Sequence, residues 1–162
     1  MRKLICAAAL LALLGAPGSA QVSLSAAERA AVFRAAGFKL QRGQWSACGD
    51  PGTAGYTAGE IETVRDLNGD GRAEAVVTEG SAYCFGMAEV GCTLVGKQAD
   101  GSWKRIADGA GFARFLATKG VGGWPDIEVG GPGFCLPVER WNGKAYVLQR
   151  HQYEGKPCRP QR

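Results

Sequence analysis

From residue 60 to residue 152 the chain consists largely of short segments in which apolar side chains recur at every second position. A period of two is that of a β-strand with one buried face. The turns Asp100-Gly101 and Asn142-Gly143 are typical of two-residue hairpins, because such pairs readily adopt left-handed conformations. We therefore expect a mainly β (α+β) fold, a small antiparallel sheet or sandwich of hairpins. The expected strands are 60–66, 75–79, 92–98, 102–107, 126–129, 136–141 and 144–152.

One helix is expected ahead of the strands. Ser25 and Glu28 have the spacing of a capping box, in which each side chain pairs with a backbone N–H at the helix start. The helix should run to Ala36, and Gly37 suits the left-handed residue that ends it. Its apolar face, which would pack on the strands, holds Ala26, Ala30, Val32, Phe33 and Ala36.

Other segments between the strands have different patterns. Residues 41–59 are rich in Gly, Pro, Ser and Thr, so we expect a long loop, pinned by Cys48, that offers a surface for binding. Asp108 would cap a short helix that Gly120 ends, and the tail from Glu154 should be irregular. The apolar face of this short helix would hold Phe112, Phe115 and Leu116.

The first twenty residues have the order of a secretory signal peptide. The basic Arg2 and Lys3 precede an apolar run, 4–14, that is shorter than the roughly 20 residues needed to span a membrane. The small residues 18–20 then suit cleavage before Gln21. We therefore expect a periplasmic or secreted protein.

The exported part, residues 21–162, has the length of one domain. Loss of Arg2 and Lys3 lowers the formal net charge from +4 to +2, and the remaining basic residues are scattered. This balance argues against a nucleic-acid partner and against membrane insertion after signal cleavage. A protein or a glycan is the expected partner.

Five cysteines remain once Cys6 leaves with the signal peptide: Cys48, Cys84, Cys92, Cys135 and Cys158. In an exported protein of this size they are expected to form structural disulfides. Because the number is odd, at least one cysteine has no disulfide partner within the chain. Their pairing stays open at this stage, and Cys84 with Cys92 is one geometrically possible pair.

The chain also contains a faint internal repeat. Residues 72–85, RAEAVVTEGSAYCF, align loosely with residues 124–137, WPDIEVGGPGFCLP. In each, a carboxylate precedes an apolar strand, and glycines and an aromatic-Cys pair follow. Two β units of similar build would explain this pattern, and chance similarity is the alternative. Two units are too few for a closed propeller, which needs at least about four blades.

The segment DLNGDGRAE, residues 66–74, alternates oxygen-bearing residues with others and lies between two expected strands. Calcium takes about six to eight oxygen ligands, and a curled chain supplies them at every second residue where glycine permits a left-handed turn. Gly69 and Gly71 meet that need. Three carboxylates this close repel one another without a cation. The candidate ligands are the side chains of Asp66, Asn68, Asp70 and Glu74 and the backbone carbonyl of Arg72.

This segment resembles the FG-GAP type of repeat, the calcium loop of integrin-like β-propeller blades, over about residues 63–80. The resemblance rests on the spacing D-x-N-x-D-G-x-x-E, and it implies the same five ligands and a structural Ca²⁺ that fixes two strands. An EF-hand is not expected, because the twelfth loop position is Val77 and the flanks alternate like strands. An ion-free Asx-rich turn and a magnesium site are the open alternatives.

Other residues are less specific indications of a catalytic or ligand-binding site. His151, the only histidine, lies on an expected strand, and no nucleophile motif accompanies it. Glu60 and Glu62, with Asp126 and Glu128, could form a carboxylate pair of the kind glycosidases use, although a solvated strand face is the simpler explanation. Six aromatic residues would line either a core or a sugar or peptide groove: Trp45, Tyr56, Tyr83, Trp103, Trp124 and Trp141.

Together these patterns favour an exported calcium-binding β-rich module that binds a partner, with no catalytic residue assigned. Two rival functions stay open. One is a small cell-envelope hydrolase acting on glycan or peptide, with Glu60, Glu62 or His151 in acid/base roles. The other is a periplasmic enzyme inhibitor whose loop 41–59 inserts into its target.

Overall fold

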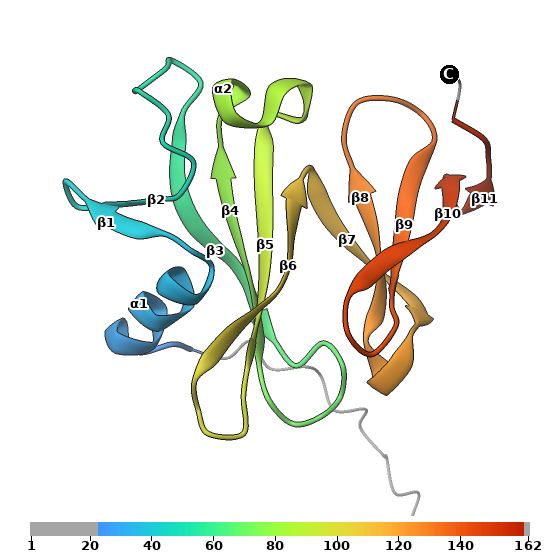
Figure 1. The fold of residues 1–162 in the computed structure, drawn as a ribbon, viewed down its shortest axis with the longest axis horizontal. Coiled ribbons are helices and arrows are strands. Elements are labelled where there is room, and N and C mark those ends of the chain that lie inside the picture. Colours follow the sequence, from blue (N-terminus) through green and yellow to red (C-terminus); the bar gives the residue numbers. More distant parts are fainter. Residues whose placement is uncertain (1–22, 161–162) are drawn as a thin grey trace, which may run out of the picture.

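Two antiparallel sheets lie face to face in the computed structural model, which describes residues 23–160 (Figure 1). The first sheet has the order β3-β4-β5-β6 and the second the order β11-β10-β9-β8-β7. The strands of the first sheet are β3 (Thr57–Arg65), β4 (Glu74–Gly80), β5 (Val90–Lys97) and β6 (Trp103–Ala110). The strands of the second are β7 (Phe112–Lys119), β8 (Pro125–Gly130), β9 (Leu136–Trp141), β10 (Tyr146–Tyr153) and β11 (Lys156–Pro157). The expected mainly β fold of antiparallel hairpins is confirmed.

An apolar cluster joins the two sheets. Val76 of β4 and Leu94 of β5 are buried together with Ile127 of β8. Because side chains alternate between the faces of a sheet, the neighbours of Val76 point the other way, toward the outer face of the first sheet. The side chains that complete the contact are partly buried and include Leu67, Ile106, Ala113, Phe115 and Tyr146.

Helix α1 (Ala26–Ala35) packs against the outer face of the first sheet (Figure 1). Its capping box is formed as expected: the Ser25 hydroxyl accepts the N–H of Glu28 at 3.3 Å, and the Glu28 carboxylate accepts the N–H of Ser25 at 3.1 Å. Gly37 follows the helix with φ of +91°. The buried cluster between helix and sheet consists of Val32, Phe33, Ala36, Phe38, Val64, Ala75, Val77 and Val95.

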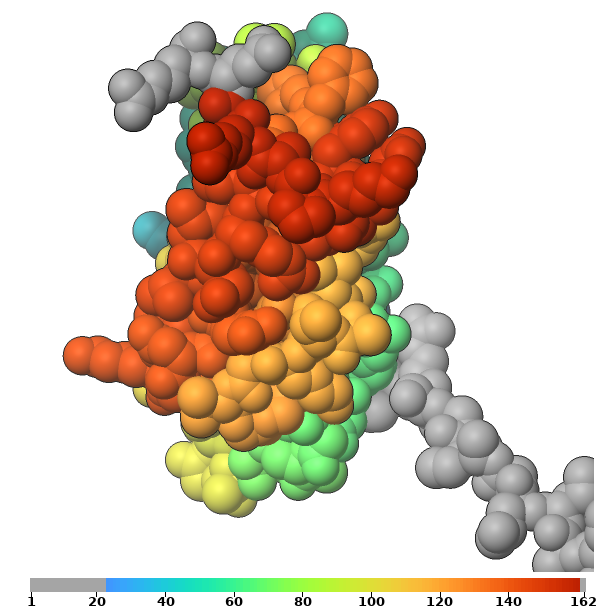
Figure 2. Space-filling model, turned by 90° about the vertical axis from the view of Figure 1, so that its right-hand side faces the viewer, coloured from blue at the N-terminus to red at the C-terminus, as the bar shows by residue number. Residues whose placement is uncertain are grey.

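The two sheets share one plan. Each contains four successive strands that pair in sequence order, β3 to β6 in the first sheet and β7 to β10 in the second. Residues 72–85 and 124–137 supply the second strand of each unit, β4 and β8, which supports the internal repeat. Figure 2 shows the outer face of the second unit, formed by the orange and red strands.

The structure contradicts the short helix expected over Phe112, Phe115 and Leu116. These residues belong to β7, and Phe115 pairs with Ile127 of β8. Ala113 and Phe115 both pack in the cluster between the sheets, which is a spacing of two. Pairing between distant segments therefore overrides the helical spacing of the aromatic residues.

The expected loop 41–59 is only partly irregular. Its first residues belong to a small hairpin of β1 (Lys39–Gln41) and β2 (Gln44–Ser46), and β3 already begins at Thr57. The tail, expected to be irregular, contributes the short strand β11 beside β10. The remaining helical elements are α2 (Ala82–Phe85) and the single 3-10 turns η1 (Gly86–Ala88) and η2 (Val121–Gly123).

Within residues 23–160, two disulfides join Cys48 to Cys84 and Cys135 to Cys158, and Cys92 has a free thiol. The odd thiol and the pinning of the segment 41–59 by Cys48 are confirmed, whereas the pairing of Cys84 with Cys92 is wrong. The expected signal peptide lies outside the described residues. No helix within residues 23–160 has the length and apolar character to cross a membrane.

Candidate metal centre

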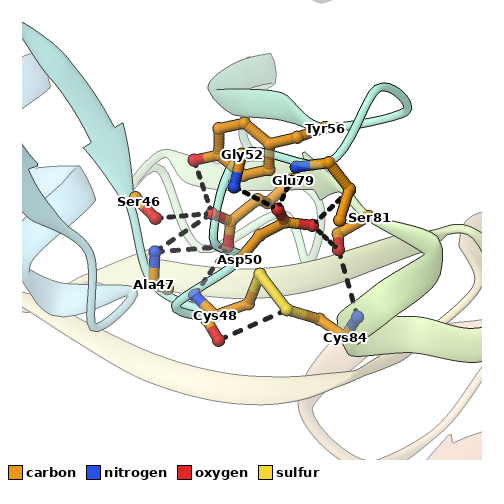
Figure 3. Close-up of a disulfide and its surroundings, with 10 residues drawn as sticks. Ser46, Ala47, Cys48, Asp50, Gly52, Tyr56, Glu79, Ser81 and Cys84 are labelled. Atoms are coloured by element: carbon orange, nitrogen blue, oxygen red, sulfur yellow. Dashed lines mark hydrogen bonds between the residues drawn. A yellow bond between two sulfur atoms is a disulfide. The ribbon is translucent and has the colours of Figure 1, made fainter.

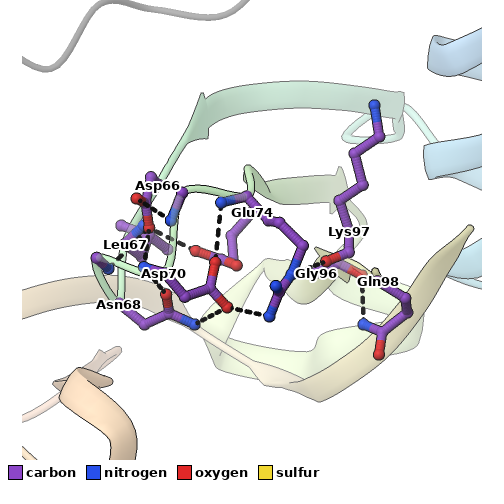
Figure 4. A network of polar contacts seen from close by, with 11 residues as sticks. Asp66, Leu67, Asn68, Asp70, Glu74, Gly96, Lys97 and Gln98 are labelled. Atoms are coloured by element: carbon purple, nitrogen blue, oxygen red, sulfur yellow. Dashed lines mark hydrogen bonds and ion pairs between the residues drawn. The ribbon is translucent and has the colours of Figure 1, made fainter. Parts of the chain in front are cut away.

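The acidic loop between β3 and β4 curls around the carboxylate of Asp66 (Figure 4). Oδ1 of Asp66 accepts the N–H of Gly69 at 2.7 Å, and Oδ2 accepts the N–H of Gly71 at 2.9 Å. Both glycines have φ of +83°, the left-handed conformation that glycine adopts without steric cost. The two glycines therefore have the role that the sequence predicts for them.

Asn68 and Asp70 meet on the same turn. Oδ1 of Asn68 accepts the N–H of Asp70 at 2.9 Å, and Nδ2 of Asn68 lies 3.3 Å from Oδ2 of Asp70. Asp70 also accepts a hydrogen bond from the guanidinium of Arg72 at 2.5 Å. This ion pair is solvent-exposed, where such pairs contribute about 0 to 1 kcal/mol. Asp70 therefore has only a weakly held protein cation beside it.

Glu74, the last candidate ligand, is buried, with 2% of its surface exposed. Its Oε2 accepts the N–H of Leu67 at 2.7 Å. Burial raises the pKa of Glu74 to about 7, and the negative charges of Asp70 and Asp66 add to that rise. No basic side chain within residues 23–160 forms an ion pair with Glu74. Ionised Glu74 is therefore costly in free energy unless a cation lies beside it.

The carboxylates of the loop do not converge on one point. No three His, Cys, Asp or Glu side chains in the described part of the chain are close enough to hold a metal ion. Asp66 and Glu74 instead accept backbone N–H groups of the loop itself. The donors are nevertheless all hard oxygen atoms, which is the ligand set that Ca²⁺ prefers. The residues thus fit calcium by donor type and by the uncompensated charge of Glu74.

A buried carboxylate in the second unit lies at the equivalent position. Asp126 aligns with Glu74 in the internal repeat and is fully buried at the start of β8. Arg140 donates two hydrogen bonds to it, at 2.8 and 2.9 Å, and Arg150 donates one at 3.0 Å. The bonds from Arg140, together with one from the Thr118 hydroxyl, hold the pKa of Asp126 well below its ordinary value. The protein itself therefore balances the charge of Asp126.

The acidic loop also contacts the second sheet. Leu67 packs in the apolar cluster that joins the sheets. The backbone oxygen of Asn68 approaches Gly123 of η2 so closely that a Cβ at residue 123 would lie 2.4 Å from it. The loop therefore bridges the two units, and its conformation affects how they pack.

The other polar residues singled out by sequence lie elsewhere. Glu60 and Glu62 are on β3 of the first sheet, and His151 is on β10 of the second. Glu128, on the outer face of the second sheet, forms an ion pair with Arg114. The structure therefore does not bring the two pairs of candidate carboxylates together in one site.

The six aromatic residues do not form one groove. Trp45 stacks on Phe33 in the core, with ring centroids 4.7 Å apart, and Tyr83 is 69% exposed on α2. Trp124 and Trp141 lie together, with centroids 5.5 Å apart. This last pair borders a pocket beside the acidic loop.

Sequence reasoning missed a further buried carboxylate, that of Glu79 near the end of β4 (Figure 3). Its oxygens accept hydrogen bonds from the hydroxyls of Ser46 and Tyr56 and from the backbone N–H groups of Ala47 and Cys48. The disulfide of Cys48 ties down the same segment. These contacts fix residues 46–56 to the first sheet. A pattern of local spacing does not reveal them, because the donors lie 23 to 33 residues away along the chain.

Comparisons with protein-family models, with curated proteins and with solved structures find no match to this chain.

Proposed function

We propose that this chain is an exported calcium-binding β-rich module, in which a structural Ca²⁺ in the loop 66–74 steadies the contact between the two sheets. The bound ion supplies positive charge to the acidic turn and no catalysis. The residues that would hold it are Asp66, Asn68, Asp70 and Glu74 through side-chain oxygens and Arg72 through its backbone carbonyl.

The burial of Glu74 with no basic partner in the described part of the chain carries this proposal. The second unit balances Asp126 with two arginines, whereas the first unit places Glu74 beside Asp66 and Asp70. A cation bound among three carboxylates on one turn offsets their mutual repulsion. A divalent ion bound by the loop would supply to Glu74 what Arg140 and Arg150 supply to Asp126.

The position of the loop supports a structural role for the ion. Leu67 and Asn68, which lie between the first and third candidate ligands, make the contacts with the second sheet. Ordering the loop therefore orders the junction of the two units. Metal binding of this kind couples directly to folding stability, because the unfolded chain has no preformed site.

Calorimetric titration of the chelator-treated exported chain with CaCl₂ and then with MgCl₂ tests this proposal. We expect one calcium site, with a dissociation constant on the order of 10⁻⁴ to 10⁻³ M as in other extracellular modules, and weaker binding of Mg²⁺. Asp70→Ala should abolish the heat of binding.

The matched control is Glu62→Gln, which removes one exposed carboxylate of β3 outside the loop and should leave calcium binding unchanged. Absence of calcium binding by the unaltered chain, or equal binding by the Asp70→Ala variant, would contradict the proposal.

A further inference from the structure

A pocket of about 460 Å³ lies beside the acidic loop. Its walls come from both units, with Gln98 and Lys104 in the first and Trp124, Trp141 and Lys144 in the second. Its volume falls in the range of about 300 to 1,000 Å³ that is common for small-ligand sites. The pocket depends on the same junction between the sheets that the acidic loop bridges.

Aromatic rings form one wall of this pocket. Trp124 and Trp141 are half-buried, so part of each ring remains accessible. Tyr146 holds them in place: it meets Trp124 edge-on at 88° and lies 5.4 Å from Trp141. The Tyr146 hydroxyl is anchored by donating to the carbonyl of Pro125 at 3.0 Å. A fixed ring of this kind binds the C–H face of a sugar, because its negative π face attracts weakly positive hydrogens.

Basic residues outnumber acidic ones in the lining of the pocket, which also includes Asp70 and Glu74 of the acidic loop. Three of its basic residues are engaged in ion pairs: Arg72 with Asp70, Lys97 with Glu28 and Arg105 with Asp108. Lys104 and Lys144 are exposed and form no ion pair within residues 23–160. A calcium ion beside Glu74 would leave these two ammonium groups as the uncompensated charge, which favours an anionic ligand.

Gln98 adds a polar group of defined orientation. Its amide nitrogen donates to the carbonyl of Gly96 at 2.8 Å, which fixes the side chain and leaves its oxygen as an acceptor. A sugar hydroxyl is a suitable donor for this oxygen.

We infer that this pocket binds an acidic saccharide, a short sugar chain that carries carboxylate groups. One sugar ring stacks on Trp124 or Trp141, and its carboxylates pair with Lys104 and Lys144. The inference rests on the proposed calcium-binding function, because an empty acidic loop adds negative charge to the pocket. A single-stranded nucleic acid would require a basic groove that follows successive phosphates, whereas only two unpaired lysines among residues 23–160 border this pocket.

The test is titration of the calcium-loaded exported chain with trigalacturonate, followed by the intrinsic fluorescence of tryptophan. Cellotriose serves as the neutral sugar, inorganic phosphate as the simple anion and a short oligothymidylate as the nucleic acid. The double variant Lys104→Gln/Lys144→Gln should weaken trigalacturonate binding by at least about tenfold, because it removes two charge-assisted contacts. Trp141→Ala should weaken binding of trigalacturonate by a similar factor.

The matched controls are Lys39→Gln/Lys156→Gln, two exposed lysines outside the pocket, and Tyr83→Ala, an exposed aromatic residue of α2. Both should bind trigalacturonate as the unaltered chain does. Lys104 and Lys144 are exposed, so their variant tests the inference even if Trp141→Ala fails to fold.

Thermal melting of the same samples with chelator and with calcium separates the two proposals. A melting temperature that rises with calcium, without any binding of trigalacturonate, overturns this inference and leaves the proposed function standing. Absence of any calcium response overturns the proposed function and the inference with it. Equal binding of cellotriose, phosphate or oligothymidylate, or unchanged binding by the double lysine variant, also overturns the inference.

Discussion

Glu74 and Asp126 occupy equivalent positions in the two β units, near the start of the second strand of each, yet within residues 23–160 only Asp126 is paired with arginine. Arg140 and Arg150 donate three hydrogen bonds to Asp126. Glu74 has backbone N–H donation from Leu67 and two acidic neighbours. One molecule thus contains a compensated and an uncompensated version of the same buried carboxylate.

This difference predicts opposite effects of two neutralising substitutions in the calcium-free protein. Glu74→Gln should raise the free energy of unfolding at pH 8 by about 1 to 3 kcal/mol, because it removes an unpaired buried charge. Asp126→Asn should lower it by about 2 to 4 kcal/mol, because it leaves two arginines without their partner. Urea unfolding in the presence of a chelator measures both. If both substitutions changed the free energy of unfolding in the same direction, Glu74 and Asp126 would not differ in charge compensation.

Acid should weaken the protein through Asp126. The arginine contacts lower the pKa of Asp126, so the stability they provide is complete above the ordinary pKa of about 4. That stability is lost as the pH falls through the lowered pKa of the folded state. We expect the urea midpoint to fall between pH 5 and pH 2 by more in the unaltered chain than in Asp126→Asn. If the urea midpoints of the two proteins fell by the same amount between pH 5 and pH 2, Asp126 would not be the origin of the acid sensitivity.

Gly123 should be essential to the contact between the acidic loop and the second sheet. Gly123→Ala places a Cβ 2.4 Å from the backbone oxygen of Asn68, at a residue with φ of +78°. Gly43→Ala is the matched control, because Gly43 has φ of +82° and no atom within 4 Å of an added Cβ. The control should cost roughly 1 to 2 kcal/mol from backbone strain alone. Gly123→Ala should cost more than the control and weaken calcium binding, as measured by unfolding and calorimetric titration.

Arg72 should tolerate substitution without loss of calcium binding. The proposed ligand at this position is the backbone carbonyl, and the guanidinium instead pairs with Asp70. Arg72→Ala should therefore bind calcium at least as tightly as the unaltered chain, because it frees a carboxylate ligand. Calorimetric titration measures this, and loss of calcium binding would show that the side chain holds the loop in shape.

Cys92 should be chemically inert in the folded protein. Burial raises the pKa of its thiol to about 11, so the reactive thiolate is only about one part in a thousand at pH 8. Reaction of a protein comprising residues 21–162 with a disulfide reagent such as DTNB should be slow in buffer and reach one equivalent in guanidinium chloride. Fast reaction of one equivalent of thiol without denaturant would contradict the raised thiol pKa, and three or more equivalents in denaturant would contradict the two disulfides.

Much of the fold follows from local sequence. The capping box of Ser25 and Glu28 and the turns at Asp100-Gly101 and Asn142-Gly143 specify a helix start and two hairpins. These features depend on residues that are close in sequence, whose backbone preferences are known. Neither the capping box nor the two turns indicates how the hairpins are arranged within their sheets.

Features that depend on distant contacts were predicted less well. Phe112 and Phe115 have helical spacing but lie on β7, because β8 offers a partner strand. The cluster of Glu79 with the segment that contains Cys48 likewise joins residues 31 positions apart. In the acidic loop, spacing alone predicted the candidate oxygen ligands. The lack of a basic partner for Glu74 among the described residues became visible only in three dimensions.

A crystal structure of residues 21–162 grown in millimolar calcium is the decisive measurement for the proposed site. We expect an ion within the turn of residues 66–74, with oxygens of Asp66, Asp70 and Glu74 among its ligands at about 2.3–2.6 Å. The carboxylate of Glu74 would then contact the ion as that of Asp126 contacts its arginines. A high-resolution map that shows only water among these oxygens would contradict a structural calcium site in this loop.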